Sequence, residues 1–335
     1  MNIAFAGLRH DHVFALYTMA EINPLYRIVG AFEEDDGARR RAEARGVVCS
    51  YTSFEDLLRD PMVDVVALGG CYGDRGNMAI KALQSGKHVI ADKPLCTALD
   101  ELDEIERLAK ERGRKVSCMF TMRFEKKINA LKALVESGAL GEINNVYFGG
   151  QHPLQYGRRP MWYFEERKHG GVINDIAIHG IDVLSYALGL ETRQILAARC
   201  WNKIAEKQPK FKESAQLMLT AQNGAGILGD VSYAIPDGIE FDLPYYWQFY
   251  IWGTKGTLRF SLNEETSYYY ISGKKEPFLL DEEEIKTDYL TDFYNLVSGC
   301  GDTRLPMEDV FRSTRTALEI QSTAETQCGT PVSCQ

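Results

Sequence analysis

The sequence predicts an α/β protein made of an N-terminal doubly wound parallel sheet and a C-terminal α/β domain with a large, mostly antiparallel open sheet. Strand-like and helix-like segments alternate through the first third of the chain, and strand follows strand after about residue 143. A length of 335 residues is also comfortable for two domains. We therefore expect domains at residues 1–122 and 123–335.

The N-terminal prediction rests on short apolar runs separated by helical patterns. Such near-continuous apolar strands are typical of a parallel sheet that helices cover on both faces. The expected strands are residues 3–6, 28–32, 63–68, 88–91 and 115–120. The expected helices begin near Val13, span residues 37–45, end near Leu83 and span residues 99–112.

The C-terminal prediction begins with a helix over residues 124–136 and the turn-rich segment 137–141. Turn residues such as Asn223-Gly224 then join successive strands, which favours antiparallel pairing. The expected strands are residues 143–150, 193–201, 215–221, 226–233, 247–252, 257–260 and 267–271. Helices over residues 283–297 and 307–323 complete the pattern.

Composition narrows the class of partner. A net charge of -9 disfavours nucleic acid and anionic membrane surfaces, because phosphate binding needs a basic face. The eight cysteines form no CxxC pair, so we expect reduced thiols, although Cys328 and Cys334 could pair on oxidation. The N-terminus lacks a basic region before a long apolar run, which favours a cytoplasmic protein without membrane contact.

Lys93 is the first candidate catalytic residue. It follows the strand over residues 88–91 within the sequence Asp92-Lys93-Pro94. Ligands of open α/β sheets bind outside the carboxyl ends of the strands, where this ammonium would project. Alternatively, the lysine and proline only end the strand, because proline lacks the ladder donor.

A second candidate is the helix expected to begin near Asn174, with Asn174 or a neighbour near its N-cap. Asp175, His179 and Asp182 are spaced to share one face, in apolar surroundings. A carboxylate satisfying a buried histidine is the structural alternative. Together with Lys93, the pair supplies an oriented base and a cation beside a developing alkoxide, which alcohol oxidation requires.

The nucleotide signal lies after the first strand, at Gly7-Leu8-Arg9-His10. Only the first glycine of GxGxxG is present, and we expect Arg9 to compensate by contacting a phosphate. Glu33, at the end of the second strand, can accept from ribose hydroxyls and repel a 2′-phosphate, which favours NAD over NADP. Arg39–Arg41 could instead receive a phosphate, although a solvated helix face accounts for them better.

His10-Asp11-His12 also has the residue types of a metal site. We expect no metal, because three adjacent side chains point in different directions and no second cluster completes a tetrahedral set.

Taken together, these motifs resemble the Gfo/Idh/MocA family of oxidoreductases. The resemblance rests on Gly86-Lys87-His88-Val89, on Asp92-Lys93-Pro94 in place of the usual Glu-Lys-Pro, on the segment 137–143, and on Gly170-Gly171 followed by Asp175, His179 and Asp182. It implies an N-terminal Rossmann domain that binds NAD. It also implies that Lys93 contacts the nicotinamide region and substrate hydroxyl, that His179 is the general acid/base, and that Asp175 contacts substrate and tunes the pair.

The chain departs from the family pattern after the third expected strand. Cys71-Tyr72 and Arg75 stand where the family commonly has Pro-Asn and then a histidine. They either shape an unusual substrate end or are permissible replacements in a loop. We expect cofactor contacts from Gly7, Leu8, Arg9, His10, Glu33, Cys71, Tyr72, Asp92 and Lys93.

The expected substrate is a sugar, cyclic polyol or related compound with a secondary alcohol. Its contacts would be Lys93, Arg123, His152, Trp162, Asp175 and His179. Further candidates with aromatic faces or hydrogen-bonding groups, which equally suit core packing, are Gln155, Tyr156, Arg158, Tyr163, Lys168 and Tyr245–Trp247.

Two other functions remain open at this point. An enzyme of the same family could recycle a tightly held NAD during elimination or epimerisation, and a non-catalytic sensor could use the same fold. We also expect a homodimer or homotetramer, because the open face of the second sheet needs a cover.

Overall fold

A computed structural model describes residues 1–239 and 241–326, which form two compact units. The first unit contains Met1–Thr121, Glu165–Gly170 and Lys286–Arg315. The second contains, among the described residues, Met122–Phe164, Gly171–Ile285 and 316–326. Two later segments thus belong to the first unit, which a single division near residue 122 does not anticipate. Cys328 and Cys334 lie outside the described residues.

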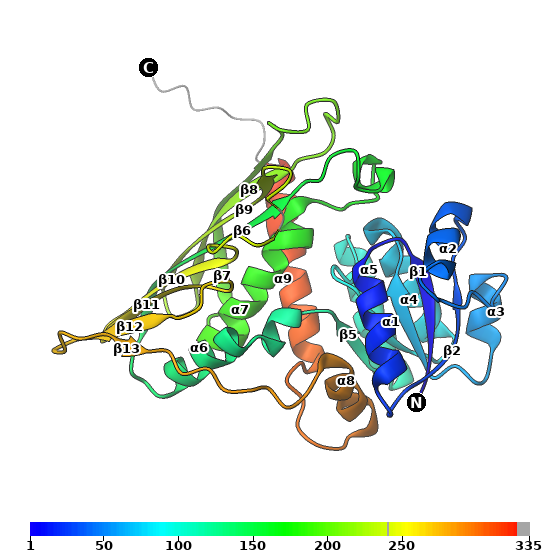
Figure 1. The fold of residues 1–335 in the computed structure, drawn as a ribbon, viewed down its shortest axis with the longest axis horizontal. Helices are drawn as coiled ribbons and strands as arrows, with labels where there is room; N and C mark the ends of the chain where they lie inside the picture. Colours follow the sequence, from blue (N-terminus) through cyan, green and yellow to red (C-terminus); the bar gives the residue numbers. More distant parts are fainter. Residues whose placement is uncertain (240, 327–335) are drawn as a thin grey trace. The chain divides into compact units, whose positions relative to one another are not determined.

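The first unit is built on a parallel sheet, blue to cyan in Figure 1. Within the described residues it has five strands in the order β2-β1-β3-β4-β5, and every pair is parallel. The predicted doubly wound sheet is therefore confirmed. The strands are β1 (Asn2–Leu8), β2 (Arg27–Phe32), β3 (Val65–Gly69), β4 (His88–Ala91) and β5 (Val116–Cys118).

Helices of the first unit separate these strands in sequence. Ser53 caps the short helix α3, which the apolar pattern did not reveal, by accepting from the Asp56 amide. Helix α8 begins after Asp288, six residues later than expected, because that carboxylate caps it by accepting from the Thr291 amide. The helices are α1 (His12–Ile22), α2 (Asp36–Glu43), α3 (Phe54–Arg59), α4 (Tyr72–Gln84), α5 (Leu99–Arg112) and α8 (Tyr289–Ser298).

Gly7 allows β1 to approach the end of β3. Its φ is +74°, and a Cβ atom there would lie 2.6 Å from the backbone of Gly70. Only glycine combines that backbone conformation with that proximity. The first glycine of the sequence motif is therefore required by the packing of two strand ends.

The second unit contains a sheet of eight strands in the described part of the chain, in the order β13-β12-β11-β10-β6-β9-β8-β7. β6 and β9 are parallel and the other pairs are antiparallel, which confirms the mostly antiparallel prediction. The strands are β6 (Ile143–Pro153), β7 (Thr192–Trp201), β8 (Ser214–Ala221), β9 (Gly226–Ile235), β10 (Gln248–Gly253), β11 (Gly256–Ser261), β12 (Tyr268–Ile271) and β13 (Phe278–Leu279).

Helices α6 (Lys126–Glu136) and α7 (Ile178–Leu188) lie on one side of this sheet, with the later part of α9 (Met307–Thr326) (Figure 1). A Cβ atom on Gly180 would lie 2.4 Å from the Phe148 ring, so the glycine lets α7 pack closely on β6. A π-helical segment, Ile173–Ala177, leads into α7. Asn174 lies inside that segment and is not its cap; the cap is its near neighbour Val172.

The sheet also exposes large apolar side chains. Leu196, Met218 and Leu228 come from the three neighbouring strands β7, β8 and β9, and each is about half exposed. Whether a second copy covers them stays a prediction. Among residues 1–239 and 241–326, no helix combines the length and apolar character needed to cross a membrane.

Candidate active site

The first unit has a cavity of about 620 Å³ at the carboxyl ends of its strands. This is the edge at which open α/β sheets bind ligands. Gly7 and Arg9 line it after β1, Glu33 lines it after β2, and Cys71 lines it after β3. Further lining residues carry either charge, namely Glu34, Arg39, Glu55, Asp74, Lys81, Glu101 and Lys168.

Glu33 ties the first two strand ends together. Its buried carboxylate accepts from the Leu8 amide at 2.5 Å, from Arg9 Nε at 2.7 Å and from the Asp35 amide at 2.8 Å. A carboxylate offers about four acceptor positions, so capacity remains for one further donor. Arg9, expected to contact phosphate, here forms an ion pair with Glu33. Both cofactor contacts stay predictions.

Cys71 and Tyr72 begin helix α4 and are buried. Burial raises the pKa of the Cys71 thiol to about 12, so this cysteine stays protonated near neutral pH. The Tyr72 ring lies 5.4 Å from the His10 ring and 5.5 Å from the His169 ring. The two positions are thus packed into the first unit.

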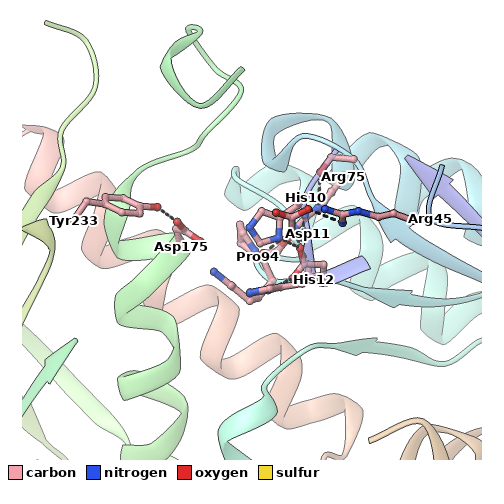
Figure 2. Close-up of polar contacts among 11 residues, drawn as sticks. His10, Asp11, His12, Arg45, Arg75, Pro94, Asp175 and Tyr233 are labelled. Carbon is pink, nitrogen blue, oxygen red and sulfur yellow. Dashed lines mark hydrogen bonds and ion pairs between the residues drawn. The ribbon is translucent and has the colours of Figure 1, made fainter. Parts of the chain in front are cut away.

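Asp92 is the buried centre of a polar cluster whose other members, His10, His12 and Arg75, are labelled in Figure 2. His10 and Arg75 are buried, and His12 is about half exposed. His10 Nδ1 lies 2.6 Å from Asp92 Oδ2, His12 Nδ1 lies 3.0 Å from Oδ1, and Arg75 Nη2 donates to Oδ2 at 2.7 Å. The expectation that the adjacent side chains all diverge was therefore wrong for the two histidines. Asp11 does point elsewhere, to Arg45.

Electrostatics set the proton positions in this cluster. Burial alone would raise the pKa of the Asp92 carboxyl, but Arg75 and the two histidines outweigh it and hold that pKa well below its usual range. Burial also lowers the pKa of His10 to about 4, against the attraction of Asp92. His10 is therefore neutral near pH 7, with its Nδ1 proton donated to the carboxylate.

His10, His12 and Asp92 also have residue types that bind metals, and their ligand atoms lie within 4.8 Å of one another. The carboxylate is already engaged by Arg75, whose guanidinium would repel a cation at this position. The expectation of no metal stays a prediction.

Lys93 follows this cluster, two residues beyond the end of β4. Its side chain is buried, and Nζ lies 5.8 Å from the centre of the Tyr72 ring. The Lys93-Pro94 peptide bond is cis. The structure thus places Lys93 at the carboxyl edge of the sheet, as the sequence predicts, while its catalytic role stays a prediction.

The second unit carries Asp175 in the π-helical segment and His179 in the first turn of α7. Both are buried. The hydroxyl of Tyr233, from β9, donates to Asp175 Oδ2, as Figure 2 shows. Sequence reasoning missed Tyr233, because nothing local marks one tyrosine of a strand as the partner of a residue 58 positions away.

Aromatic rings connect His152 to the same residues. The His152 ring lies 6.4 Å from Tyr233 and 5.9 Å from Trp247, edge to face in both cases. Trp247 in turn lies 6.0 Å from the His179 ring. The second unit therefore gathers His152, Asp175 and His179 around two aromatic side chains.

Trp162 is buried against Tyr163, with ring centres 4.2 Å apart. The Arg159 guanidinium lies 4.5 Å from the Tyr163 ring and 5.0 Å from Tyr233. Trp162 thus borders the aromatic cluster through packed neighbours, and its substrate contact stays a prediction.

Arg123, an expected substrate contact, pairs with Asp182 inside the second unit. It is wholly buried, and Nε and Nη2 donate to the two oxygens of Asp182 at 2.8 and 2.7 Å. Its guanidinium also lies 4.6 Å from the Tyr186 ring. The structure thus places Arg123 in a buried ion pair with Asp182, and its substrate contact stays a prediction.

Comparison with known families agrees with this arrangement. Residues 1–120 match the oxidoreductase family with an NAD-binding Rossmann fold, and residues 128–259 match the GFO/IDH/MocA C-terminal domain. The chain belongs to the Gfo/Idh/MocA oxidoreductase family. The resemblance inferred from Lys93 and the Asp175 helix is thereby confirmed.

Several members of the family are similar in sequence. The chain is 24% identical to the uncharacterized oxidoreductase YrbE of Bacillus subtilis, over 73% of this chain and 72% of that protein. It is 28% identical to the myo-inositol 2-dehydrogenase of Thermotoga maritima, over 49% of this chain and 47% of that enzyme. Except for YrbE, the first curated relatives are matched over about half of their length.

Several solved structures share the fold over almost the whole chain. An oxidoreductase from Erwinia carotovora atroseptica matches with a TM-score of 0.86 and 24% identity, covering 97% of this chain and 98% of that one. Levoglucosan dehydrogenase in complex with NADH matches with a TM-score of 0.79 and 18% identity, covering 98% of both chains.

Proposed function

We propose that this protein is an NAD-dependent dehydrogenase that oxidises a secondary alcohol of a sugar, cyclic polyol or related compound. The observation that carries the proposal is the cavity of about 620 Å³ at the carboxyl edge of the Rossmann sheet, the edge at which β4 also delivers Lys93. The family supplies the cofactor class. The relatives named myo-inositol 2-dehydrogenase and D-xylose dehydrogenase support the substrate class.

The cavity suits a dinucleotide in position, and Gly7 lets the backbone at the end of β1 approach a ligand closely. Its cations Arg9, Lys81 and Lys168 are paired here with Glu33, Glu55 and Asp74, and we infer that bound phosphates draw on them. Glu33 and Glu34 lie at the end of β2, where a 2′-phosphate would meet two carboxylates. We therefore infer that NAD is preferred over NADP.

A nicotinamide cofactor, held by the residues that line the cavity, would supply the acceptor for the hydride of the carbinol carbon. The protein supplies the remaining chemistry. His179 removes the hydroxyl proton, and Lys93 donates a hydrogen bond to the same oxygen and steadies its developing charge. Asp175, held by the Tyr233 hydroxyl, contacts the substrate and tunes the histidine.

The proposed substrate contacts of the second unit combine aromatic faces with polar groups. His152 Nε2 lies 3.3 Å from the Tyr246 hydroxyl, and Trp247 packs near both His152 and His179. Such surfaces suit a ring that carries several hydroxyl groups, because apolar ring faces stack while hydroxyls exchange hydrogen bonds.

The decisive test is the absorbance of reduced nicotinamide when the purified protein meets NAD and a panel of sugars, inositols and sugar acids. A substrate-dependent rise supports a dehydrogenase. With that substrate, Lys93→Met and His179→Ala should each lower kcat by about 10²- to 10⁴-fold. Their dissociation constants for NADH should stay within about threefold of wild type, because neither change removes a phosphate contact.

Retained turnover in both variants would contradict the proposed roles. Product formation without added NAD, together with nucleotide that copurifies, would instead indicate hydride recycling. Absence of NADH binding to the wild type would overturn the proposal itself.

The exposed apolar residues of β7, β8 and β9 lead to one further part of the proposal. We infer that a second copy of the chain covers this face, giving a dimer or tetramer. Light scattering should therefore report at least twice the mass of one chain. A charge placed there, in Leu228→Glu, should shift the population toward the monomer.

A further inference from the structure

Arg75, in the first turn of α4, is wholly buried and makes an unusual set of hydrogen bonds. Its Nη1 donates to three consecutive carbonyls, of Asp92 at 2.9 Å, Lys93 at 2.6 Å and Pro94 at 3.3 Å. Its Nε donates to the Gly70 carbonyl at 2.9 Å, and Nη2 donates to the Asp92 carboxylate. One side chain thus makes four hydrogen bonds to the turn that carries Lys93, three to backbone carbonyls and one to the Asp92 carboxylate.

The chemistry of the guanidinium makes this arrangement specific. A buried cation is costly unless its donors are paired, and Nε, Nη1 and Nη2 of Arg75 all donate hydrogen bonds. The planar fork directs its donors at fixed angles, whereas a lysine ammonium is a single flexible point. The Tyr72 ring covers the guanidinium at 4.6 Å and also faces Lys93 Nζ.

Asp92 extends the connection to a third segment. The carboxylate that pairs with Arg75 also accepts from His10 and His12 at the start of α1. The end of β4, the first turn of α4 and the turn after β1 therefore meet at one buried carboxylate. Two departures from the family pattern, the aspartate at 92 and the arginine at 75, are in direct contact.

We propose that Arg75 is a positioning residue that, with Asp92 as its counter-charge, fixes the turn presenting Lys93 and joins it to the turn after β1. This inference rests on the proposed function insofar as Lys93 is catalytic. The mechanical part, that Arg75 holds the turn over residues 92–94, stands on the contacts alone.

The first experiment follows amide hydrogen exchange in the full chain, which needs no activity. Arg75→Met is compared with Lys87→Met, because Lys87 also is a buried cation that donates to carbonyls, of Asp60 at 2.7 Å and Val63 at 2.8 Å. Lys87 precedes β4, whereas Arg75 holds the turn after it. The two variants thus loosen opposite ends of one strand.

Arg75→Met should accelerate exchange in the peptide that contains residues 92–96 by at least about tenfold, because the turn then opens locally. Lys87→Met should leave that peptide within about twofold of wild type. Equal exchange of this peptide in wild type and Arg75→Met would overturn the proposal.

The second experiment measures catalysis with the substrate found by the panel. Arg75→Lys keeps the positive charge but loses the planar set of guanidinium donors. It can therefore test the proposal even if Arg75→Met does not fold. We expect kcat to fall by about 10- to 100-fold, the usual effect of a catalytic group displaced by about 1 Å, while the NADH dissociation constant changes less than about threefold. An unchanged kcat in Arg75→Lys would overturn the positioning role.

A double substitution tests whether Arg75 and Asp92 act together. Arg75→His and Asp92→Glu restore the residue types common in the family, and the double variant should recover more kcat than either single variant. Strictly additive losses would contradict the coupling of the two positions.

If the wild type fails to bind NADH, the proposed function fails. The amide hydrogen exchange experiment still decides whether Arg75 holds the turn.

Discussion

Two buried arginine–aspartate pairs, one in each unit, look alike by distance and differ in what surrounds them. Arg75–Asp92 and Arg123–Asp182 are both closed by an Nη2 contact of 2.7 Å, and each guanidinium lies 4.6 Å from a tyrosine ring. Arg123 gives two donors to one carboxylate. Arg75 gives one donor to its carboxylate and the rest to backbone carbonyls. The Arg123 contacts with Asp182 join two side chains, and the Arg75 contacts also hold the loop that carries Lys93.

This difference predicts that replacing both charged residues restores stability more fully at the Arg123 pair than at the Arg75 pair. Arg123→Met and Arg75→Met should each lower the free energy of unfolding by about 3–5 kcal/mol, because a buried carboxylate loses its partner. Adding Asp182→Leu should recover most of the Arg123 loss, since apolar residues of similar volume can replace a buried ion pair. Adding Asp92→Leu should recover less and leave a loss of at least about 2 kcal/mol, because the carbonyls still lack their donor. Urea unfolding of the four variants measures this, and equal recovery would remove the distinction.

The second-largest expected difference between the two regions is in how far the free energy of unfolding falls in acid. His10 faces Asp92, His12, Lys93 and the Tyr72 ring, and its pKa is lowered to about 4. Between that value and its ordinary 6.5, the unfolded chain binds more protons, so stability falls as the pH falls. From pH 7 to pH 5 this contributes a loss of about 2 kcal/mol.

His10→Asn should remove that part of the acid-induced loss in urea unfolding at the two pH values. Arg123→Lys should not, because the Arg123–Asp182 contacts involve no histidine. An acid response of His10→Asn equal to that of the wild type would show that the histidine does not contribute.

The tyrosine rings offer a smaller test of the comparison. Tyr72→Leu should cost about 2 kcal/mol and Tyr186→Leu about 1 kcal/mol, because cation–π attraction strengthens as water is excluded and Tyr72 is the more buried ring. Tyr186→Phe is the control for the hydrogen bond from the Tyr186 hydroxyl to Asn129. Thermal unfolding that ranks the two leucine variants in reverse would contradict this explanation.

The smallest effect is expected at an exposed pair beside the Asp92 cluster. Arg45 and Asp11 lie 2.9 Å apart with side chains 51% and 82% exposed. Arg45→Ala should change the free energy of unfolding by less than about 1 kcal/mol, and added salt should reduce the difference. A loss as large as that of Arg123→Met would show that burial does not govern these pairs.

Much of the fold could be predicted from local pattern. The apolar segments of the first unit anticipated all five strands of its described sheet, and Lys93 was placed after β4. Local pattern failed where side-chain caps decide, as at Ser53 before α3 and Asp288 before α8. It also did not reveal the π-helical segment that contains Asn174.

The sequence by itself determined the α/β alternation, the family and the candidates Lys93, Asp175 and His179, because each depends on residues near one another in the chain. Only the tertiary structure decided their partners. Tyr233 meets Asp175 across 58 positions, Arg123 meets Asp182 across 59, and His10 meets Asp92 across 82. Such contacts depend on how strands and helices are ordered in space, and periodicity encodes only which face of an element is buried.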